Sequence, residues 1–223
     1  MSSLWRTLDG RLRRDIALVC LADALVGVSY GAIAVDAGFE FWLVLALSVL
    51  VLAGSAEFLF VGLIAAGGSP IAAMFAGLLV NARHLPFGLA VHDVIGRGWR
   101  RVLGSHLMND ESVVFALGER MFESKRAAYW ACGLGILICW PVGAMIGAFV
   151  GGIVGDTDAY GLDAMFPAVL LALIFPSLRN RSTRRVALFG GVIALLATPV
   201  LPAGLPVLLA LFGLVFRKKR AAE

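Results

Sequence analysis

Four long stretches of the chain carry no charged side chain, and they limit its possible folds more than any other feature. They run from Phe41 to Ala56, Phe58 to Ala82, Ala127 to Gly155 and Val186 to Phe216. A helix needs about 20 apolar residues to cross a bilayer. The chain is 60% hydrophobic and 15% charged, whereas soluble domains have roughly 45–50% and 25%. The sequence therefore predicts an all-α, polytopic membrane protein, with one transmembrane domain over residues 1–223.

Charge distribution predicts the orientation of this domain. A basic N-terminal stretch precedes the apolar segment Ile16–Val35, which has no signal-peptide cleavage region and is expected to be a retained span. Lys and Arg resist translocation. Both termini and the basic loops at 125–126 and 179–185 are therefore expected on the cytoplasmic side of the inner membrane, with the acidic loop at 156–163 outside.

The number of crossings depends on the middle of the chain, which is polar from Asp93 to Arg126. Either Val102–Met121 forms a weakly hydrophobic crossing, or the run at 69–92 enters and leaves on one side and turns near Asn81. These alternatives predict eight or six membrane segments.

Two polar interruptions inside apolar runs predict broken helices. The first is Gly54-Ser55-Ala56-Glu57, and the second is Asn81-Ala82-Arg83-His84, just before Pro86. Broken helices are a common device of transporters, because the free N–H groups of a half-helix attract anionic groups. A helix is also predicted to start at Ser69-Pro70, since proline suits the first helical turn.

Polar side chains at membrane depth cost roughly 2.5–3.5 kcal/mol for a central charge, so each one needs a reason. The candidate substrate-binding or ion-binding residues are Asp23, Ser55, Glu57, Asn81, Arg83 and His84. Arg83 can hold a carboxylate through two parallel hydrogen bonds, and Glu57 can meet an ammonium group or a proton. Two alternatives stay open: Glu57 or Asp23 is a static partner of Arg83, or Arg83 and His84 snorkel to the interface.

Several other functions have no support in the sequence. Neither the His-Glu-x-x-His motif nor the phosphate-binding Gly-Lys-Ser/Thr motif is present, so we expect neither an enzyme nor a nucleotide-driven pump, and no cofactor. No histidine completes a metal site at Asp110-Glu111, and the three cysteines lie in apolar runs. The basic residues gather at the ends of apolar runs, which indicates topology and not nucleic-acid binding.

A short pattern occurs twice. Val26-Gly27 followed by Gly31 is repeated as Val142-Gly143 followed by Gly147. The pattern indicates either an internal repeat of the kind found in transporters or close helix packing through Gly-x-x-x-Gly.

Several motifs in order resemble the AzlC family of branched-chain amino-acid exporters over about residues 16–180. They are Gly54-Ser55-Ala56-Glu57, Asn81-Ala82-Arg83-His84, Asn109-Asp110-Glu111-Ser112, Trp140 with Gly143 and Gly147, and Gly161-Leu162-Asp163-Ala164 before Phe166-Pro167. The resemblance implies a two-component secondary carrier with a small membrane subunit, AzlD. It marks Asp110, Glu111 and Asp163 as structural or coupling positions. The family commonly has Gln where this chain has Glu57.

These observations predict a gradient-driven membrane transporter that exports branched-chain or related hydrophobic amino acids. The alternatives are a membrane subunit that assembles or regulates a partner without transporting, and a channel for small solutes. Charged groups at helix breaks favour transport, because a purely structural subunit has little use for them.

Overall fold

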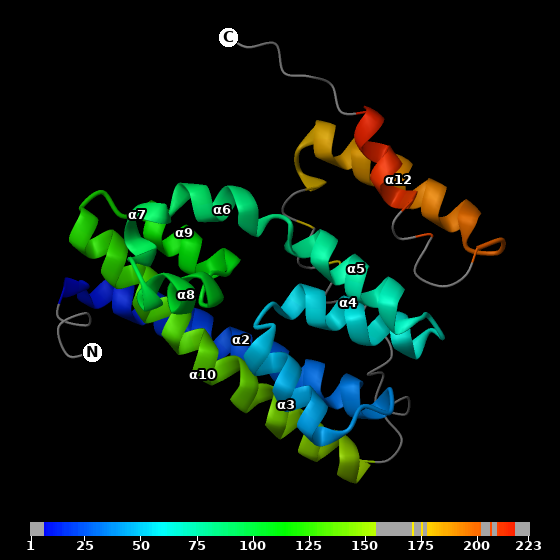
Figure 1. Ribbon diagram of the computed structural model, residues 1–223, viewed down its shortest axis with the longest axis horizontal. Coiled ribbons are helices and arrows are strands. Elements are labelled where there is room, and N and C mark those ends of the chain that lie inside the picture. Colours follow the sequence, from blue (N-terminus) through cyan, green and yellow to red (C-terminus); the bar gives the residue numbers. More distant parts are fainter. Residues whose placement is uncertain are drawn as a thin grey trace.

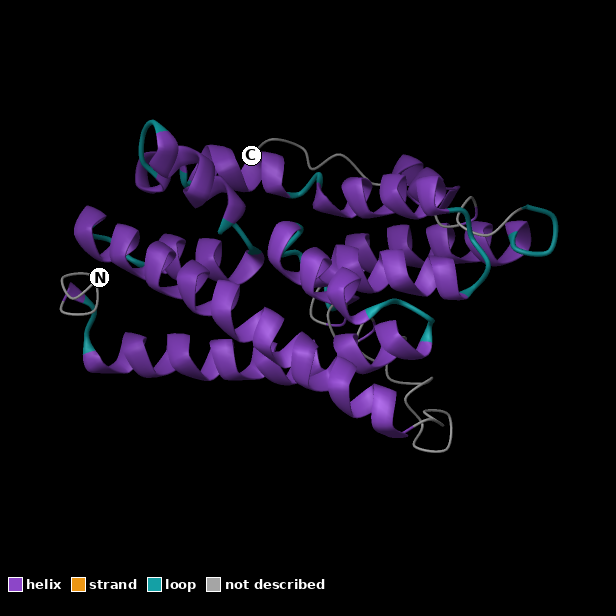
Figure 2. Cartoon of the chain, turned by 60° about the horizontal axis from the view of Figure 1, so that its bottom comes forward, coloured by secondary structure: helices purple, strands orange, loops and turns teal. Residues whose placement is uncertain are grey.

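All of the regular structure that the computed structural model describes is helical (Figures 1 and 2). The described residues are 7–154, 171, 175, 178–201, 206 and 209–216. In chain order the helices are α2 (Gly10–Asp36), α3 (Phe41–Leu50), α4 (Gly54–Ala65), α5 (Pro70–Asn81), α6 (His84–Ala90), α7 (His92–Ile95), α8 (Trp99–His106), α9 (Asp110–Gly118), α10 (Phe122–Val154), α12 (Arg181–Ala197) and the 3-10 helix η2 (Ala210–Phe216). The all-α prediction is confirmed for these residues. The predicted acidic loop at 156–163, with Asp163, lies outside them.

The two long helices, α2 and α10, run side by side through the molecule (Figure 1). They have 27 and 33 residues, which at 1.5 Å per residue gives lengths of about 40 and 50 Å. Both are long and apolar enough to cross a membrane by length and composition. They contain the predicted segments Ile16–Val35 and Ala127–Val150, and Pro141 lies inside α10.

The repeated glycine pattern forms the crossing between these two helices. A Cβ added at Gly31 would lie 1.8 Å from the carbonyl oxygen of Ala144, and one at Gly147 would lie 1.8 Å from that of Val28. Only glycine therefore lets the two backbones come this close. The prediction of close helix packing is confirmed, while an internal repeat stays a prediction.

A second layer consists of shorter helices. Helix α3 packs on α10, and α4 and α5 form a hairpin whose first helix also contacts α2. Helix α5 begins where the sequence predicts, with Pro70 in its first turn and the Ser69 side chain accepting a hydrogen bond of 3.1 Å from the Ala72 N–H. Each apolar run of this layer is divided into pieces too short to cross a membrane alone.

The short helices α6 to α9 gather around the N-terminal part of α10 (Figure 1). Two aromatic residues of α10 anchor them: the Tyr129 hydroxyl donates to the Gly104 carbonyl at 2.7 Å, and the Trp130 indole donates to the Val94 carbonyl at 3.0 Å. Because α8 ends at His106 and α9 begins at Asp110, Val102–Met121 is not one continuous helix. The number of crossings stays a prediction.

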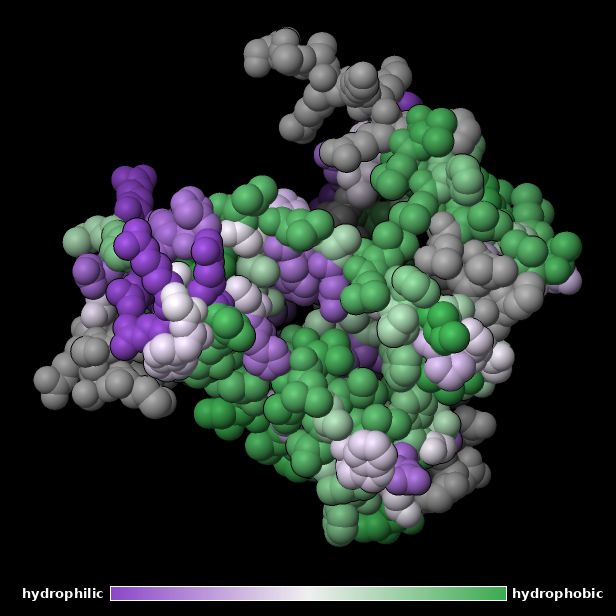
Figure 3. Space-filling view, viewed as in Figure 1, coloured by the Kyte–Doolittle hydropathy of each residue, from purple (hydrophilic) through white to green (hydrophobic). Residues whose placement is uncertain are grey.

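Large apolar side chains cover much of the outer surface, shown in green in Figure 3. On α5 they are Ile71, Met74, Phe75 and Leu78, and on α10 they are Ile138, Val142, Ile146, Phe149 and Ile153. The crossing of α2 and α10 in the interior instead places small residues between the helices, among them Gly27, Gly31, Ala144 and Gly147, as in membrane helix packing.

Candidate functional site

The first break lies at residues 51–53, between α3 and α4. Leu52 is buried and has a φ of 48°, a left-handed conformation that costs a non-glycine residue roughly 1–3 kcal/mol. Side chains satisfy both broken ends of the helix. His106 donates a ring N–H to the Val49 carbonyl at 2.8 Å, and the Glu57 carboxylate accepts the Ala53 N–H at 2.9 Å. Irregular backbone at membrane depth requires such partners.

Glu57 lies in the first turn of α4 and is 1% exposed. Its Oε1 accepts the bond from Ala53, and its Oε2 accepts a bond of 3.2 Å from the Trp140 indole N–H. Both carboxylate oxygens are thus used. Arg83 is not among these partners, so the structure differs from the alternative in which Glu57 is a static partner of Arg83.

The second break separates α5 from α6 and carries Arg83 into the space between α4 and α9. The guanidinium Nη2 donates to the Ser55 hydroxyl at 2.7 Å and pairs with the Asp110 carboxylate at 3.0 Å. Its Nε is buried and has no hydrogen-bond partner among the described residues. Asp110, and not Glu57 or Asp23, is therefore the ionic partner of Arg83.

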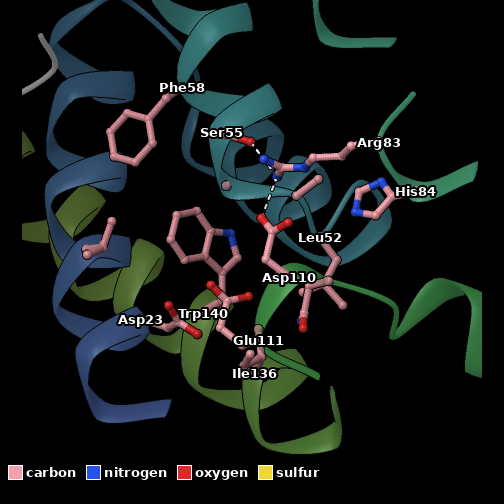
Figure 4. Close-up of a pocket in the computed structure, with 14 residues that line it drawn as sticks. Asp23, Leu52, Ser55, Phe58, Arg83, His84, Asp110, Glu111, Ile136 and Trp140 are labelled. Atoms are coloured by element: carbon pink, nitrogen blue, oxygen red, sulfur yellow. Dashed lines mark hydrogen bonds and ion pairs between the residues drawn. The ribbon is translucent and has the colours of Figure 1, made fainter. Parts of the chain in front are cut away.

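The first turn of α9 brings two carboxylates to this place. A capping box fixes it: the Ser112 N–H donates to the Asn109 side chain at 2.8 Å, and the Asn109 N–H donates to the Ser112 hydroxyl at 3.1 Å. Asp110 then points toward Arg83, whereas Glu111 lies beside Asp23 of α2 (Figure 4). One short turn thus presents one carboxylate to the second break and the other to α2.

A cavity of about 320 Å³ lies between these elements (Figure 4). Its lining combines one cation, several carboxylates and an apolar wall. The lining residues are Asp23, Val26, Leu52, Ala53, Gly54, Ser55, Phe58, Arg83, His84, Asn109, Asp110, Glu111, Ile136 and Trp140. Such a mixture of apolar surface with a few convergent polar groups is typical of small-molecule sites, which span roughly 300–1,000 Å³.

The two ends of the cavity differ in their charged groups. Arg83 and Ser55 form the positive pole, next to the Asp110 carboxylate. Asp23 and Glu111 form the negative pole, and the Oδ2 of Asp23 is buried with no hydrogen-bond partner among the described residues. Chemically, this arrangement can hold a carboxylate at one end and a cationic group at the other.

The structure brings together most of the predicted site residues. Asp23, Ser55, Arg83, His84, Asp110 and Glu111 line the cavity. Glu57 and Asn81 instead line a second cavity of about 170 Å³ between α3, α4 and α5. Asp163 lies outside the described residues.

Sequence reasoning from charge at membrane depth missed other parts of the site. Trp140, Phe58 and Ile136 line the cavity and His106 caps α3. The three cavity residues are apolar or aromatic in helices rich in such residues, so composition does not single them out. His106 lies in a polar stretch, where a histidine needs no special explanation. Only the resemblance had drawn attention to Trp140.

One catalytic pattern in the sequence has a structural role. Gly27-Val28-Ser29-Tyr30-Gly31 matches Gly-x-Ser-x-Gly, which in hydrolases requires a strand-to-helix turn. Here it lies within α2, and the glycines face α10. The Ser29 hydroxyl donates to the Leu25 carbonyl at 3.5 Å, within its own helix. This pattern therefore serves helix packing.

Known proteins similar to the chain are membrane proteins. A protein of Helicobacter pylori described as an uncharacterized membrane protein is 26% identical over 200 residues, which cover 87% of this chain and 82% of that protein. The branched-chain amino acid transport protein AzlC of Bacillus subtilis is 26% identical over 205 residues, which cover 89% of this chain and 80% of that protein. No solved structure matches the chain.

The family described as AzlC protein matches residues 18–154. This range begins in α2, ends with α10 and contains every residue that lines the cavity. The match covers more than half of the chain, and the resemblance found in the sequence motifs is confirmed. The chain belongs to the AzlC family.

Proposed function

We propose that the chain is a membrane transporter for branched-chain or similar hydrophobic amino acids. The observation that carries the proposal is the cavity, which has a positive and a negative pole and an apolar wall between helices with an apolar outer surface. The printed name of the Bacillus subtilis relative supports the same substrate class. An α-amino acid is the kind of ligand whose groups match all three parts of the cavity.

The two poles give the substrate one orientation. The α-carboxylate binds the Arg83 guanidinium, which is part-exposed beside the cavity. The ammonium group lies between Asp23 and Glu111. The aliphatic side chain then contacts the apolar wall, which includes Phe58 and Ile136.

The transporter works as an exporter that uses an ion or proton gradient, since the sequence carries no phosphate-binding motif for nucleotide-driven pumping. A small AzlD-like membrane subunit is its partner, as the family resemblance implies.

The chain lies in the inner membrane with both termini on the cytoplasmic side. A single cysteine at position 182, in a cysteine-free background, tests the orientation. Position 182 lies near the start of α12. If this end of α12 is cytoplasmic, an impermeant thiol reagent labels the cysteine in inside-out vesicles and does not label it in intact cells. Labelling from outside intact cells contradicts this orientation.

Counterflow of labelled leucine tests the transport proposal. Membrane vesicles that contain the chain, alone and with a small AzlD-like subunit, are loaded with unlabelled leucine. We expect labelled leucine to accumulate transiently in the vesicles that contain the unaltered chain. Asp23→Asn or Glu111→Gln is expected to lower this accumulation about tenfold or more, because each change removes a carboxylate from the negative pole, where the ammonium group binds. The matched control is Arg101→Lys on the exposed surface of α8. Equilibration without counterflow indicates a channel, and no leucine movement indicates a non-transporting subunit; either result contradicts the proposal.

A further inference from the structure

Trp140 separates the cavity from the buried carboxylate of Glu57. The indole ring lines the cavity on one side, and on the other its N–H donates to Glu57 at 3.2 Å (Figure 4 shows the ring beside the cavity residues). Glu57 does not line this cavity. Any effect of Glu57 on a ligand in the cavity must therefore pass through the indole or through the start of α4.

The ring of Trp140 is held from several directions. Tyr30 stacks on it with a centroid distance of 5.6 Å, and Phe58 meets it edge-on at 6.2 Å. The backbone of Gly54 lies so close that an added Cβ would be 2.8 Å from the ring carbon Cη2. These contacts fix the plane of the ring, and the bond to Glu57 determines which of the two χ2 orientations in that plane the indole adopts.

Glu57 suits this role because it is buried and each of its oxygens has one donor. Oε1 serves the Ala53 N–H at the start of α4, and Oε2 serves the indole N–H. The carboxylate thereby ties the position of the indole to the broken helix end. A glutamine has only one such oxygen, so in Glu57→Gln one of the two donors faces an amide NH₂ and loses its acceptor.

We infer that Trp140 determines which side chains the cavity accepts, and that Glu57 is a positioning residue that holds the indole in place. The inference deepens the proposed amino-acid site and rests on it. The indole forms a wall of the apolar part of the cavity, so its position sets the room left for the ligand side chain. One methylene in an apolar site is discriminated by roughly 10–200-fold, so a change in the position or size of this ring is expected to change the ligand preference.

The test compares the ligand preference of purified variants. Dissociation constants for valine and phenylalanine are measured from the stabilisation that each ligand gives against thermal unfolding. In Trp140→Phe we expect the preference for valine over phenylalanine to fall about tenfold, because the smaller ring leaves more room. In Glu57→Gln we expect a fall of about threefold. The double variant is expected to match Trp140→Phe alone, since Glu57 acts through the indole.

Two matched controls accompany these variants. Trp130→Phe removes another buried indole hydrogen bond of α10, to the Val94 carbonyl, outside the cavity, and is expected to leave the ligand preference unchanged. Gly54→Ala displaces the Trp140 ring directly without changing Glu57. It replaces Glu57→Gln in the measurement of ligand preference if Glu57→Gln does not fold. Its control is Gly118→Ala, where an added Cβ meets nothing within 4 Å.

A second measurement does not depend on substrate. In protein labelled with ¹⁵N-tryptophan, the indole N–H resonance of Trp140 is identified by its loss in Trp140→Phe. Glu57→Gln is expected to shift this resonance and to leave that of Trp130 unchanged. An unshifted Trp140 resonance contradicts the positioning role of Glu57.

The outcomes separate the inference from the proposed function. If the unaltered chain shows no stabilisation by valine or leucine, the proposed function fails and this inference fails with it. If valine binds but the preference is the same in all variants, only this inference fails. Glu57→Gln is also compared in the unaltered chain and in the Trp140→Phe background. If it shifts the pH dependence of leucine counterflow equally in both, Glu57 acts as a coupling group independently of the indole, and the positioning role is contradicted.

Discussion

Buried backbone N–H and C=O groups find their hydrogen-bond partners differently at the crossing of α2 with α10 and in the layer of interrupted helices. At the crossing, both helices are continuous and glycines let the backbones touch, with an added Cβ only 1.8 Å from a carbonyl oxygen at Gly31 and at Gly147. In the interrupted layer, the helices stop at residues 51–53 and 82–83. There, side chains such as His106 and Glu57 replace the missing backbone partners.

The difference shows where chemistry can be placed in a membrane fold. A continuous helix satisfies its own backbone, so its side chains are free to pack. A break exposes N–H and C=O groups and requires polar side chains, which then also become available to a ligand. Accordingly, Arg83 and Ser55 lie at breaks and Asp110 lies at a capped helix start. The crossing contributes Trp140 to the apolar wall, and it also contributes Asp23 to the negative pole, so one charged group of the cavity does lie on a continuous helix.

The largest effect is expected at the crossing. Gly147→Ala places a methyl group in the space of the Val28 carbonyl, so the two helices must separate. Overpacking usually costs about 1–3 kcal/mol, and here the backbone cannot rotate away, so we expect a loss of about 3 kcal/mol or more in the free energy of unfolding. Reversible unfolding in mixed micelles measures it.

The control for that variant lies on the same helix. An added Cβ at Gly152 meets nothing within 4 Å, and Gly152→Ala is expected to be neutral or slightly stabilising because alanine favours the helix. Equal effects of the two changes would show that the crossing is not held by close backbone contact.

The next largest effect is expected at the positive pole. Arg83→Lys keeps the charge but loses the planar guanidinium, whose Nη2 contacts both Ser55 and Asp110 and whose shape allows paired hydrogen bonds to a carboxylate. We expect leucine counterflow to fall by about 10–100-fold, which corresponds to about 1.4–2.8 kcal/mol, while thermal stability changes little. Counterflow at the original rate would mean that Arg83 does not contact the substrate.

Sequence patterns predicted the parts of the fold that depend on local composition. An apolar run after a basic stretch located α2, and a run without charge located α10. Gly54 and Pro86 indicated the breaks closely, because each lies in the first turn of the helix that follows a break. The partner of Arg83 could not be predicted in this way, since Asp110 is 27 positions away and only the fold brings them together. The role of Trp140 was hidden for a similar reason: an aromatic residue in an apolar helix fits packing and ligand contact equally well.

A smaller effect is expected at the end of α3. His106→Ala removes the donor to the part-buried Val49 carbonyl, and the loss of this hydrogen bond is expected to cost about 1 kcal/mol. His106→Gln can still donate from its amide and is expected to recover part of this loss. Equal stability of the alanine variant and the unaltered chain in thermal unfolding would show that water or the chain itself satisfies the carbonyl.

The smallest effect compares two helix caps, one at the cavity and one remote from it. Asn109 caps α9, and Asn180 caps α12 by accepting the N–H groups of Ser182 and Thr183 at 2.9 and 3.3 Å. Replacing either by alanine is expected to cost about 1 kcal/mol of stability. Only Asn109→Ala is expected to weaken leucine binding, about threefold to tenfold, because the α9 cap orients Asp110 and Glu111. Asn109→Ser keeps the acceptor and is expected to restore binding. If both alanine variants bind leucine equally well, the first turn of α9 does not position the cavity carboxylates.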